Sequence, residues 1–295
     1  MTKEIICPRC KSKEVVKRGY FNTEAYGKQQ RYFCKSCNKK FIPQTAFYRM
    51  RNNPKKITLA IDLFYRGISL RKTQEHLGAF LPHNSSHMSI LRWVRRYSLM
   101  IGNYTDKLQI NSGNELMSDE MEYRTNGQQT WFVDVLDTTT RYIVSSEFMR
   151  SRTIENLTNV LRLAKQKTGN QVKIVTTDGL QGYSSVLKKT FGLKTHWNHK
   201  SPIIHNIVIA SERGFNHKIE RLHNNIRERT KIFRGFGSIE SARAIMKGYE
   251  IFHNFIKKHQ GIDCCPYELA IPELNDKLNV PNKWLALIEL ATQNN

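Results

Sequence analysis

Three carboxylates in this sequence stand where they could share divalent metal ions: Asp119 and Asp178 on expected strands, and Glu220 on an expected helix. Asp119 falls on the more apolar face of its strand, where an ionised carboxylate is costly unless a cation or hydrogen bonds compensate. Asp178 follows another strand, at the carboxyl end where open α/β sheets bind ligands. Together the three could hold two divalent ions, as phosphoryl transfer on DNA requires.

Each carboxylate also has a purely structural interpretation when it is taken singly. Asp119 could be a charge at a strand edge, Asp178 with Gly179 an ordinary turn, and Glu220 a partner for an arginine on its own helix. The metal hypothesis is favoured only when the three are considered jointly, on the order of elements described below.

Other acids near Asp119 compete with it or accompany it. Glu120 alternates onto the opposite face of the strand and is expected in solvent. Asp134 is expected inside the following strand, and Asp137 is expected to begin a turn. Asp119 is therefore the preferred first acid.

A second set of metal ligands lies near the start of the chain, in two C-x-x-C pairs separated by 23 residues. Each pair presents two thiolates from one tight turn, and two pairs complete the tetrahedron that Zn²⁺ prefers. Short strands are expected at 14–20 and 30–33, which predicts a zinc ribbon whose metal supports the fold and does no chemistry. Disulfides and a redox pair are the alternatives, but no secretion signal is recognised and a redox motif would not be duplicated. The four predicted zinc ligands are Cys7, Cys10, Cys34 and Cys37.

Basic side chains are concentrated in the first third of the 295 residues. The whole chain has 47 Lys and Arg against 25 Asp and Glu, a net charge of +22, and residues 1–100 contain 21 of the basic and 5 of the acidic residues. This asymmetry predicts an N-terminal region that binds a polyanion, with double-stranded DNA as the expected partner. No apolar run approaches the ~18 residues of a membrane span, so no membrane partner is expected.

Three short helices are expected after the ribbon. Asn53 and Pro54 begin the first, Ser69 caps a second that Gly78 ends, and Ser85 or Ser86 opens the third. Their lengths and tight turns predict a helix-turn-helix unit, with an ordinary helical bundle as the alternative.

The third helix, 86–97, is expected to read DNA, because its apolar face must point into the helical core. The residues expected to face bases are His87, Ser89 and Arg92. The residues expected to contact phosphates are Arg95 and Arg96 on the helix and Lys17, Arg18, Lys39 and Lys40 on the ribbon.

From residue 115 the pattern predicts an α/β domain. Strands are expected at 115–124, 129–136 and 141–147, a helix at 153–166, a strand at 172–177, a helix at 183–190, a strand near 194–197 and a long helix at 216–231. This order is typical of a ribonuclease-H-like core, a mixed sheet flanked by helices. The expected domains are a zinc ribbon at 1–46, a helix-turn-helix domain at 47–104, the catalytic domain at 105–272 and a helical tail at 273–295.

Four segments of this α/β region resemble DDE transposases of prokaryotic insertion sequences. They are Ser118–Met121, Trp131–Asp134, Thr176–Gly179 and, most specifically, Asn216–Arg227 followed by Arg234–Ser238. The last is similar to the signature around the third acid in the insertion-sequence-six (twenty-six) family. Forty-one residues separate Asp178 from Glu220, more than is usual there, so residues 197–214 are expected to add a hairpin or loop.

The resemblance implies a catalytic triad of Asp119, Asp178 and Glu220 that holds Mg²⁺ (or Mn²⁺), with Arg227 at the family's basic position and Asn224 supporting it. It implies a transposase that binds the terminal inverted repeats of its element, cleaves the ends and joins them to target DNA. Because two ends are processed together, a homodimer or larger assembly is expected, in the cytoplasm of a prokaryote and associated with the nucleoid.

Two other functions stay open at this point. The chain could be a domesticated DNA-binding regulator whose catalytic fold is only a scaffold, or a ribonuclease-H-like nuclease without strand transfer. A further cluster of histidines, His196, His199 and His205, is expected to be DNA contact or plain surface and not a metal site.

Overall fold

The protein is described here by a computed structural model. The structure describes residues 5–23, 26–43, 45–48, 50–81, 85–192, 203–208, 217–233 and 235–294. The chain forms two compact units, residues 1–59 and 60–295. No helix among the described residues is both long enough and apolar enough to cross a membrane.

The first unit contains a three-stranded antiparallel sheet, β1 (Val15–Thr23), β2 (Gly27–Cys34) and β3 (Lys40–Phe41), in that order. Its small core consists of Cys7, Cys34 and Phe41, so two of its three buried side chains are predicted metal ligands. The hairpin of β1 and β2 is longer than the sequence predicts, and most of β1 is exposed.

Three helices follow: α1 (Pro54–Tyr65), α2 (Leu70–Phe80) and α3 (His87–Thr105). The predicted caps are present, since Asn53 Oδ1 accepts from the Lys55 amide and the Ser69 and Ser86 hydroxyls accept from the amides of Lys72 and Ser89. The predicted ends of the second and third helices are wrong. α2 continues through Gly78, and α3 runs eight residues past Tyr97 because its buried face continues.

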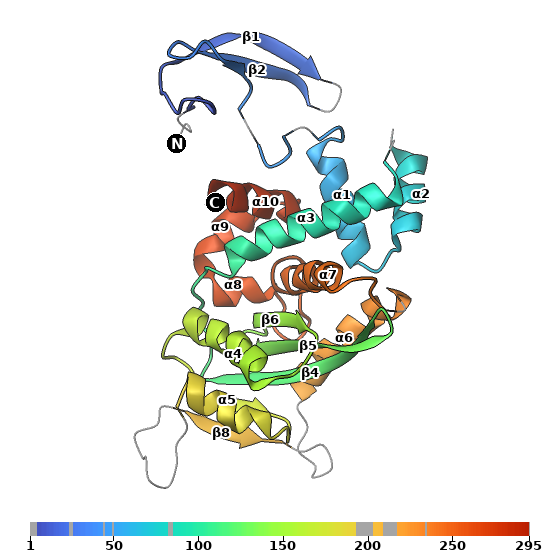
Figure 1. The fold of residues 1–295 in the computed structure, drawn as a ribbon, viewed down its shortest axis with the longest axis vertical. Helices are drawn as coiled ribbons and strands as arrows, with labels where there is room; N and C mark the ends of the chain where they lie inside the picture. The colour runs from blue at the N-terminus through green and yellow to red at the C-terminus, as the bar shows by residue number, and fades with distance from the viewer. Residues whose placement is uncertain are drawn as a thin grey trace. The chain divides into compact units, whose positions relative to one another are not determined.

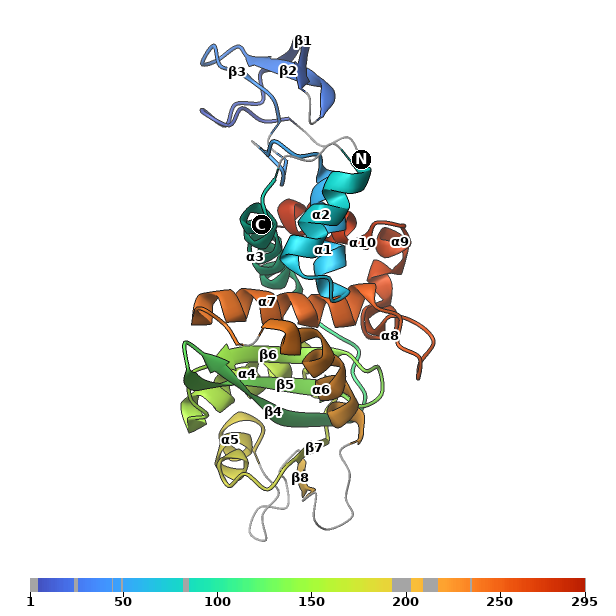
Figure 2. The same cartoon turned by 90° about the vertical axis from the view of Figure 1, so that its right-hand side faces the viewer.

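The second unit is built on a five-stranded sheet of order β6-β5-β4-β7-β8 (Figures 1 and 2). The strands are β4 (Glu115–Thr125), β5 (Gln128–Asp137), β6 (Ile143–Met149), β7 (Ile174–Thr177) and β8 (Ile204–Ile207). β4, β5 and β6 pair antiparallel, whereas β7 pairs parallel with β4 and β8 parallel with β7. This mixed sheet has the predicted ribonuclease-H-like arrangement.

The fifth strand of this sheet differs from the prediction. A strand was expected near 194–197, which lies outside the described residues, and 197–214 was expected as a hairpin or loop. The described edge strand is β8, within that segment, and Ile174 pairs with Ile204. Part of the long insertion before Glu220 therefore extends the sheet.

Helices α4 (Ile154–Thr168), α5 (Gly182–Thr190), α6 (His217–Thr230) and α7 (Ile239–Ile251) accompany the sheet. Adjacent serines of β6 identify its two faces: Ser145 Oγ donates to the Val160 carbonyl of α4, and Ser146 Oγ donates to Glu250 of α7. α4 and α7 therefore cover opposite faces. The chain ends in α8 (Pro266–Ala270), α9 (Asn275–Leu278) and α10 (Lys283–Gln293).

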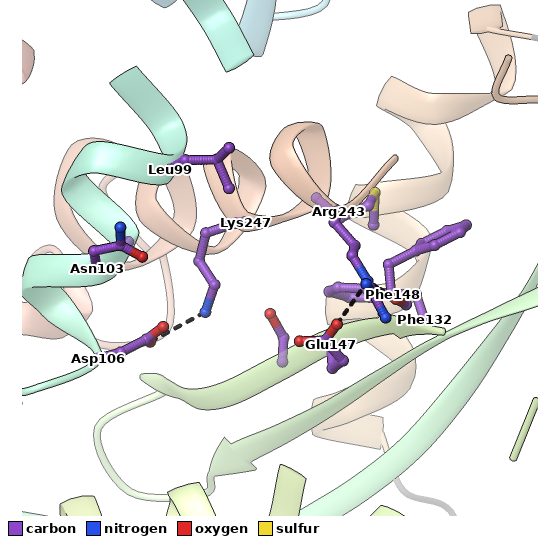
Figure 3. Close-up of a pocket in the computed structure, with 11 residues that line it drawn as sticks. Leu99, Asn103, Asp106, Phe132, Glu147, Phe148, Arg243 and Lys247 are labelled. Atoms are coloured by element: carbon purple, nitrogen blue, oxygen red, sulfur yellow. Dashed lines mark hydrogen bonds and ion pairs between the residues drawn. The ribbon is translucent and has the colours of Figure 1, made fainter. Parts of the chain in front are cut away.

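Helix α3 packs on α7, and a cavity of about 190 Å³ lies between these helices and β6 (Figure 3). Its charged side chains pair with one another: Lys247 Nζ lies 3.1 Å from Asp106 Oδ1, and Arg243 Nε lies 2.9 Å from Glu147 Oε1. These ion pairs connect the helical region to the sheet. None of the three predicted catalytic acids lines the cavity.

Candidate active site

The strand register places Asp119 and Asp178 side by side, where the pairing of β4 with β7 ends. β4 and β7 run parallel, and their last recorded pair is Ser118 with Thr177. Asp119 and Asp178 are the next residue on each chain, so their carboxylates leave neighbouring strands at the same level. Oδ1 of Asp119 accepts from the Glu120 amide at 2.8 Å, and Oδ1 of Asp178 accepts from the Leu180 amide at 3.0 Å.

Glu120 is the third acid of this group, and the sequence analysis did not predict its participation. Carboxylate oxygens of Asp119, Glu120 and Asp178 all lie within 4.8 Å of one another. The predicted alternation of Glu120 onto the face opposite Asp119 agrees with the register, but its expected exposure to solvent is wrong. Tyr183 of α5 covers that face through its contact with Ser118, and Oε1 of Glu120 is buried without a hydrogen-bond partner among the described residues.

The electrostatics of this cluster favour the binding of cations. Burial raises the pKa of Glu120 to about 7, and the charges of Asp178 and Asp119 add to the increase. Burial also raises the pKa of Asp119, although nearby His223 opposes the change. Close carboxylates disfavour each other's charged forms, and a bound cation removes that penalty. The oxygen-rich donor set and the unpartnered Oε1 therefore fit a hard divalent ion such as Mg²⁺.

The third predicted acid, Glu220, lies in the first turn of α6 and is half-buried. Its carboxylate is not among the three that lie within 4.8 Å of one another. The two predicted supporting residues, Asn224 and Arg227, are exposed on the same helix. The structure thus brings Asp119 and Asp178 together and leaves Glu220 outside that group.

His223 is a candidate site residue that the sequence analysis did not select. Its Nε2 lies 2.8 Å from Oδ1 of Asp134, and its Nδ1 lies 3.4 Å from Oδ2 of Asp119. Burial alone lowers the pKa of His223, but the charge of Asp134 and the hydrogen bond to it outweigh burial, so the pKa is raised. The sequence did contain a signal for His223. It lies on the same side of α6 as the buried Leu222 and Ile226, whereas Asn224 lies on the exposed side.

Asp134 and Asp137 have the positions that the sequence predicts. Asp134 lies within β5, directly opposite Asp119, and is fully buried. Asp137 ends β5 and accepts hydrogen bonds from the amides of Gly113, Thr139 and Thr140. Asp137 therefore stabilises the turn that follows β5.

Of the three histidines noted above, His196 and His199 lie outside the described residues. His205 lies on β8, where Nε2 is 2.8 Å from Thr177 Oγ1.

The four N-terminal cysteines form one cluster. Their sulfur atoms all lie within 4.8 Å of one another, with 3.5 Å between Cys7 and Cys37 and between Cys10 and Cys34. A tetrahedral zinc with bonds of ~2.3 Å places its sulfurs about 3.8 Å apart. Burial raises the pKa of Cys7, but hydrogen bonds from the amides of Cys10 and Arg9 and from the thiols of Cys37 and Cys10 together outweigh burial and lower the pKa to about 6. Free thiols at these separations fit a zinc site.

The predicted DNA contacts differ in exposure. Arg92 and Arg96 are exposed along one side of α3, whereas His87, Ser89 and Arg95 are half-buried. All four basic residues predicted on the ribbon are exposed: Lys17, Arg18, Lys39 and Lys40. The Arg18 guanidinium also lies 4.8 Å from the centroid of the Phe33 ring, so its side chain is held above the hairpin.

The fold and site together define a class. A ribonuclease-H-like mixed sheet with carboxylates clustered in the middle of β4 and just after β7 is the framework of a metal-dependent polynucleotidyl transferase. Residues 114–259 match the DDE domain of IS240-type transposases. Residues 114–259 therefore form a DDE domain like that of insertion-element transposases, and the enzyme class is DDE-type polynucleotidyl transferase.

One relative is an uncharacterized 48.3 kDa protein of insertion element ISM1 from Methanobrevibacter smithii. The two sequences are 25% identical over an alignment of 294 residues, and the match covers 86% of this chain and 68% of that protein.

Two solved structures show a partial likeness. The HTLV-2 integrase catalytic core in complex with magnesium is 13% identical, with a TM-score of 0.37, over 54% of this chain and 97% of the other. The simian T-cell lymphotropic virus intasome in complex with a PP2A regulatory subunit is 12% identical, with a TM-score of 0.40, over 71% and 73%. The assignment of the DDE domain follows from the sequence match and not from these likenesses.

The cysteine cluster predicts about one zinc per chain, because one tetrahedral ion uses all four thiolates. Cys34→Ser should lose the zinc and the protection of the ribbon from proteolysis, since the small core contains Cys34 itself. Elemental analysis and limited proteolysis would measure both. Cys264→Ser, outside the cluster, is the matched control. A metal-free wild type, or an unchanged ribbon in Cys34→Ser, would contradict the assignment.

Glu120 predicts a pH dependence of stability in the presence of EDTA. Its folded pKa of about 7 lies above the ordinary value of 4.5, so between these values the folded state binds more protons than the unfolded state. Stability should therefore fall as pH rises from 4.5 to 7, by roughly 2 kcal/mol after allowance for solvent screening. Urea unfolding of wild type and Glu120→Gln across this range should show a smaller fall in the variant. Parallel curves would contradict the prediction.

Proposed function

We propose that this protein is a transposase that binds the terminal inverted repeats of its element, cleaves the ends and joins them to target DNA. The observation that carries the proposal is the proximity of the Asp119 and Asp178 carboxylates, one residue beyond the last recorded pair of β4 and β7, within residues that match a DDE domain. The proposed catalytic residues are Asp119, Asp178 and Glu220, with Asn224 and Arg227 in supporting positions on α6.

The protein's part in this chemistry is to hold its carboxylates in place. Mg²⁺ or Mn²⁺ bound by Asp119, Asp178 and Glu220 would supply activation of the attacking oxygen and stabilisation of the leaving oxygen. The amides of Glu120 and Leu180 fix one oxygen of Asp119 and one of Asp178, and the other oxygen of Asp119 faces Nδ1 of His223 at 3.4 Å. Water attacks in cleavage and a 3′-hydroxyl attacks in joining, so no covalent protein–DNA intermediate is needed.

Recognition of the DNA ends is proposed for α3 and the zinc ribbon. Arg92 is exposed near the start of α3 and, with His87 and Ser89, is proposed to face bases. The phosphate contacts proposed are Arg95, Arg96, Lys17, Arg18, Lys39 and Lys40. The charge of +22 supports DNA as the partner.

Because two ends must be processed together, we propose a homodimer or a larger assembly that acts in the cytoplasm of a prokaryote. An assay with terminal repeats, Mg²⁺ and a target plasmid distinguishes this function from its alternatives. Only a transposase yields joined products, a nuclease yields cleaved ends alone, and a DNA-binding regulator yields neither.

Asp119→Asn, Asp178→Asn and Glu220→Gln should each reduce cleavage and joining to a few per cent of wild type or less, with repeat binding nearly intact. An amide keeps the shape of the carboxylate but loses the charge that holds a divalent ion. Glu122→Gln, exposed on the same strand as Asp119, is the matched control and should stay active. Substantial joining by one variant would remove that residue from the triad.

Arg92→Ala and Arg96→Ala should weaken DNA binding in different ways. Arg92→Ala should cost ~1–3 kcal/mol on the cognate repeat and little on scrambled DNA, because a base contact is sequence-specific. Arg96→Ala should weaken both alike and lower the salt dependence of log K by about one. Binding to both duplexes across a salt series measures this. Equal loss on both duplexes with Arg92→Ala would exclude α3 as the reading helix.

A further inference from the structure

His223 contacts carboxylates on two different strands at once. It is only 3% exposed, and its ring lies between Asp134 of β5, at 2.8 Å, and Asp119 of β4, at 3.4 Å. A single side chain of α6 therefore connects this helix to both strands. One of those strands carries the first proposed metal ligand.

Among the residues that the structure describes, His223 is the side-chain partner of Asp134. Asp134 is 0% exposed, its Oδ1 pairs with His223, and its Oδ2 has no partner among the described residues. An isolated buried carboxylate is costly, and a buried charge is normally paired or hydrogen-bonded. This hydrogen bond therefore compensates the buried charge of Asp134 and also fixes the orientation of the His223 ring.

This pair also restricts Asp119. Oδ1 of Asp119 accepts from the Glu120 amide, and Oδ2 faces Nδ1 of His223. Both oxygens are thus oriented by the protein before any cation arrives. Asp119, Asp134 and Ser146 follow one another across β4, β5 and β6, so this arrangement lies on the α7 face of the sheet.

The placement of Glu220 follows from the same contact. Glu220 precedes His223 by three residues on α6, and residues at this spacing lie on neighbouring positions of a helix surface. The buried Ile219, Leu222 and Ile226 attach α6 to the sheet, but apolar contacts are non-directional. The polar contacts of His223 supply a directional constraint on the rotation of the helix.

We propose that His223 and Asp134 are positioning residues that hold Asp119 on β4 and Glu220 on α6 in the geometry that binds the catalytic cations. This inference rests on the proposed function and goes beyond its triad. Groups that orient ligands from outside a metal site contribute roughly 10–100-fold to metal affinity or activity.

The test compares three variants with wild type. His223→Leu removes both contacts, and His223→Gln keeps an amide donor that can reach Asp134. The double variant His223→Leu/Asp134→Leu removes the buried charge as well, because replacing both members of a buried pair by apolar residues avoids leaving one uncompensated. Glu228→Gln, exposed on α6, is the control. The measurements are thermal melting in EDTA, Mn²⁺ binding followed by electron paramagnetic resonance, and end cleavage across a Mg²⁺ series.

His223→Leu should melt below wild type and bind Mn²⁺ roughly 10–100-fold more weakly. The double variant should recover most of the melting temperature but not the Mn²⁺ affinity, which separates positioning from simple stability. His223→Gln should recover part of the affinity, and Glu228→Gln should match wild type. Cleavage should need correspondingly more Mg²⁺ in the variants that bind Mn²⁺ weakly.

Wild-type Mn²⁺ affinity in His223→Leu or in the double variant would overturn the inference and make the pair purely structural. The proposed function fails separately, if wild type binds Mn²⁺ through Asp119 and Asp178 but neither cleaves nor joins repeat-bearing DNA. The Mn²⁺ measurement still tests the positioning role in that case.

Discussion

The parallel pairing of β4 with β7 is the constraint on which the site depends. It places Asp119 and Asp178 at the same level, each one residue beyond the pair Ser118–Thr177. Two carboxylates so close repel each other and lose hydration, and Glu120 adds a third whose pKa burial raises to about 7. This arrangement is unfavourable by itself and becomes favourable with a bound cation. The strand register therefore holds the carboxylates in an arrangement that a divalent metal ion can bind.

The remaining elements of the second unit support that geometry from both faces. On one face Tyr183 of α5 hydrogen-bonds Ser118 beside the acids, and on the other His223 of α6 contacts Asp119 and Asp134. The pair of Lys247 with Asp106 connects α7 to the end of α3, and Glu250, which pairs with Lys247 on α7, accepts a hydrogen bond from Ser146 of β6. Polar contacts of this kind are directional, and they fix orientation where apolar packing fixes only proximity.

The sheet of the first unit has too small an apolar core to be stabilised in the same way. Its core of Cys7, Cys34 and Phe41 is too small to stabilise a sheet by burial alone, and its hairpin is largely exposed. Four thiols gathered within 4.8 Å can replace the missing core with metal–sulfur bonds. The exposed hairpin surface, with Arg18 held over Phe33, is then free to carry the basic residues that a DNA partner needs.

Local chemistry in the sequence determined much of this protein: the two C-x-x-C pairs, the caps Asn53 and Ser69, the order of strands and helices, and Asp119 on one strand and Asp178 at the carboxyl end of another. These features depend on residues close together in the chain, whose turn, cap and strand preferences act locally. The tertiary structure alone decided that Glu120 is covered by α5 and that His223 meets Asp134 across 89 residues. It also decided where β8 joins the sheet and how far α3 extends. Burial and long-range pairing depend on which element covers a face, and that is a property of the whole fold and not of any one segment.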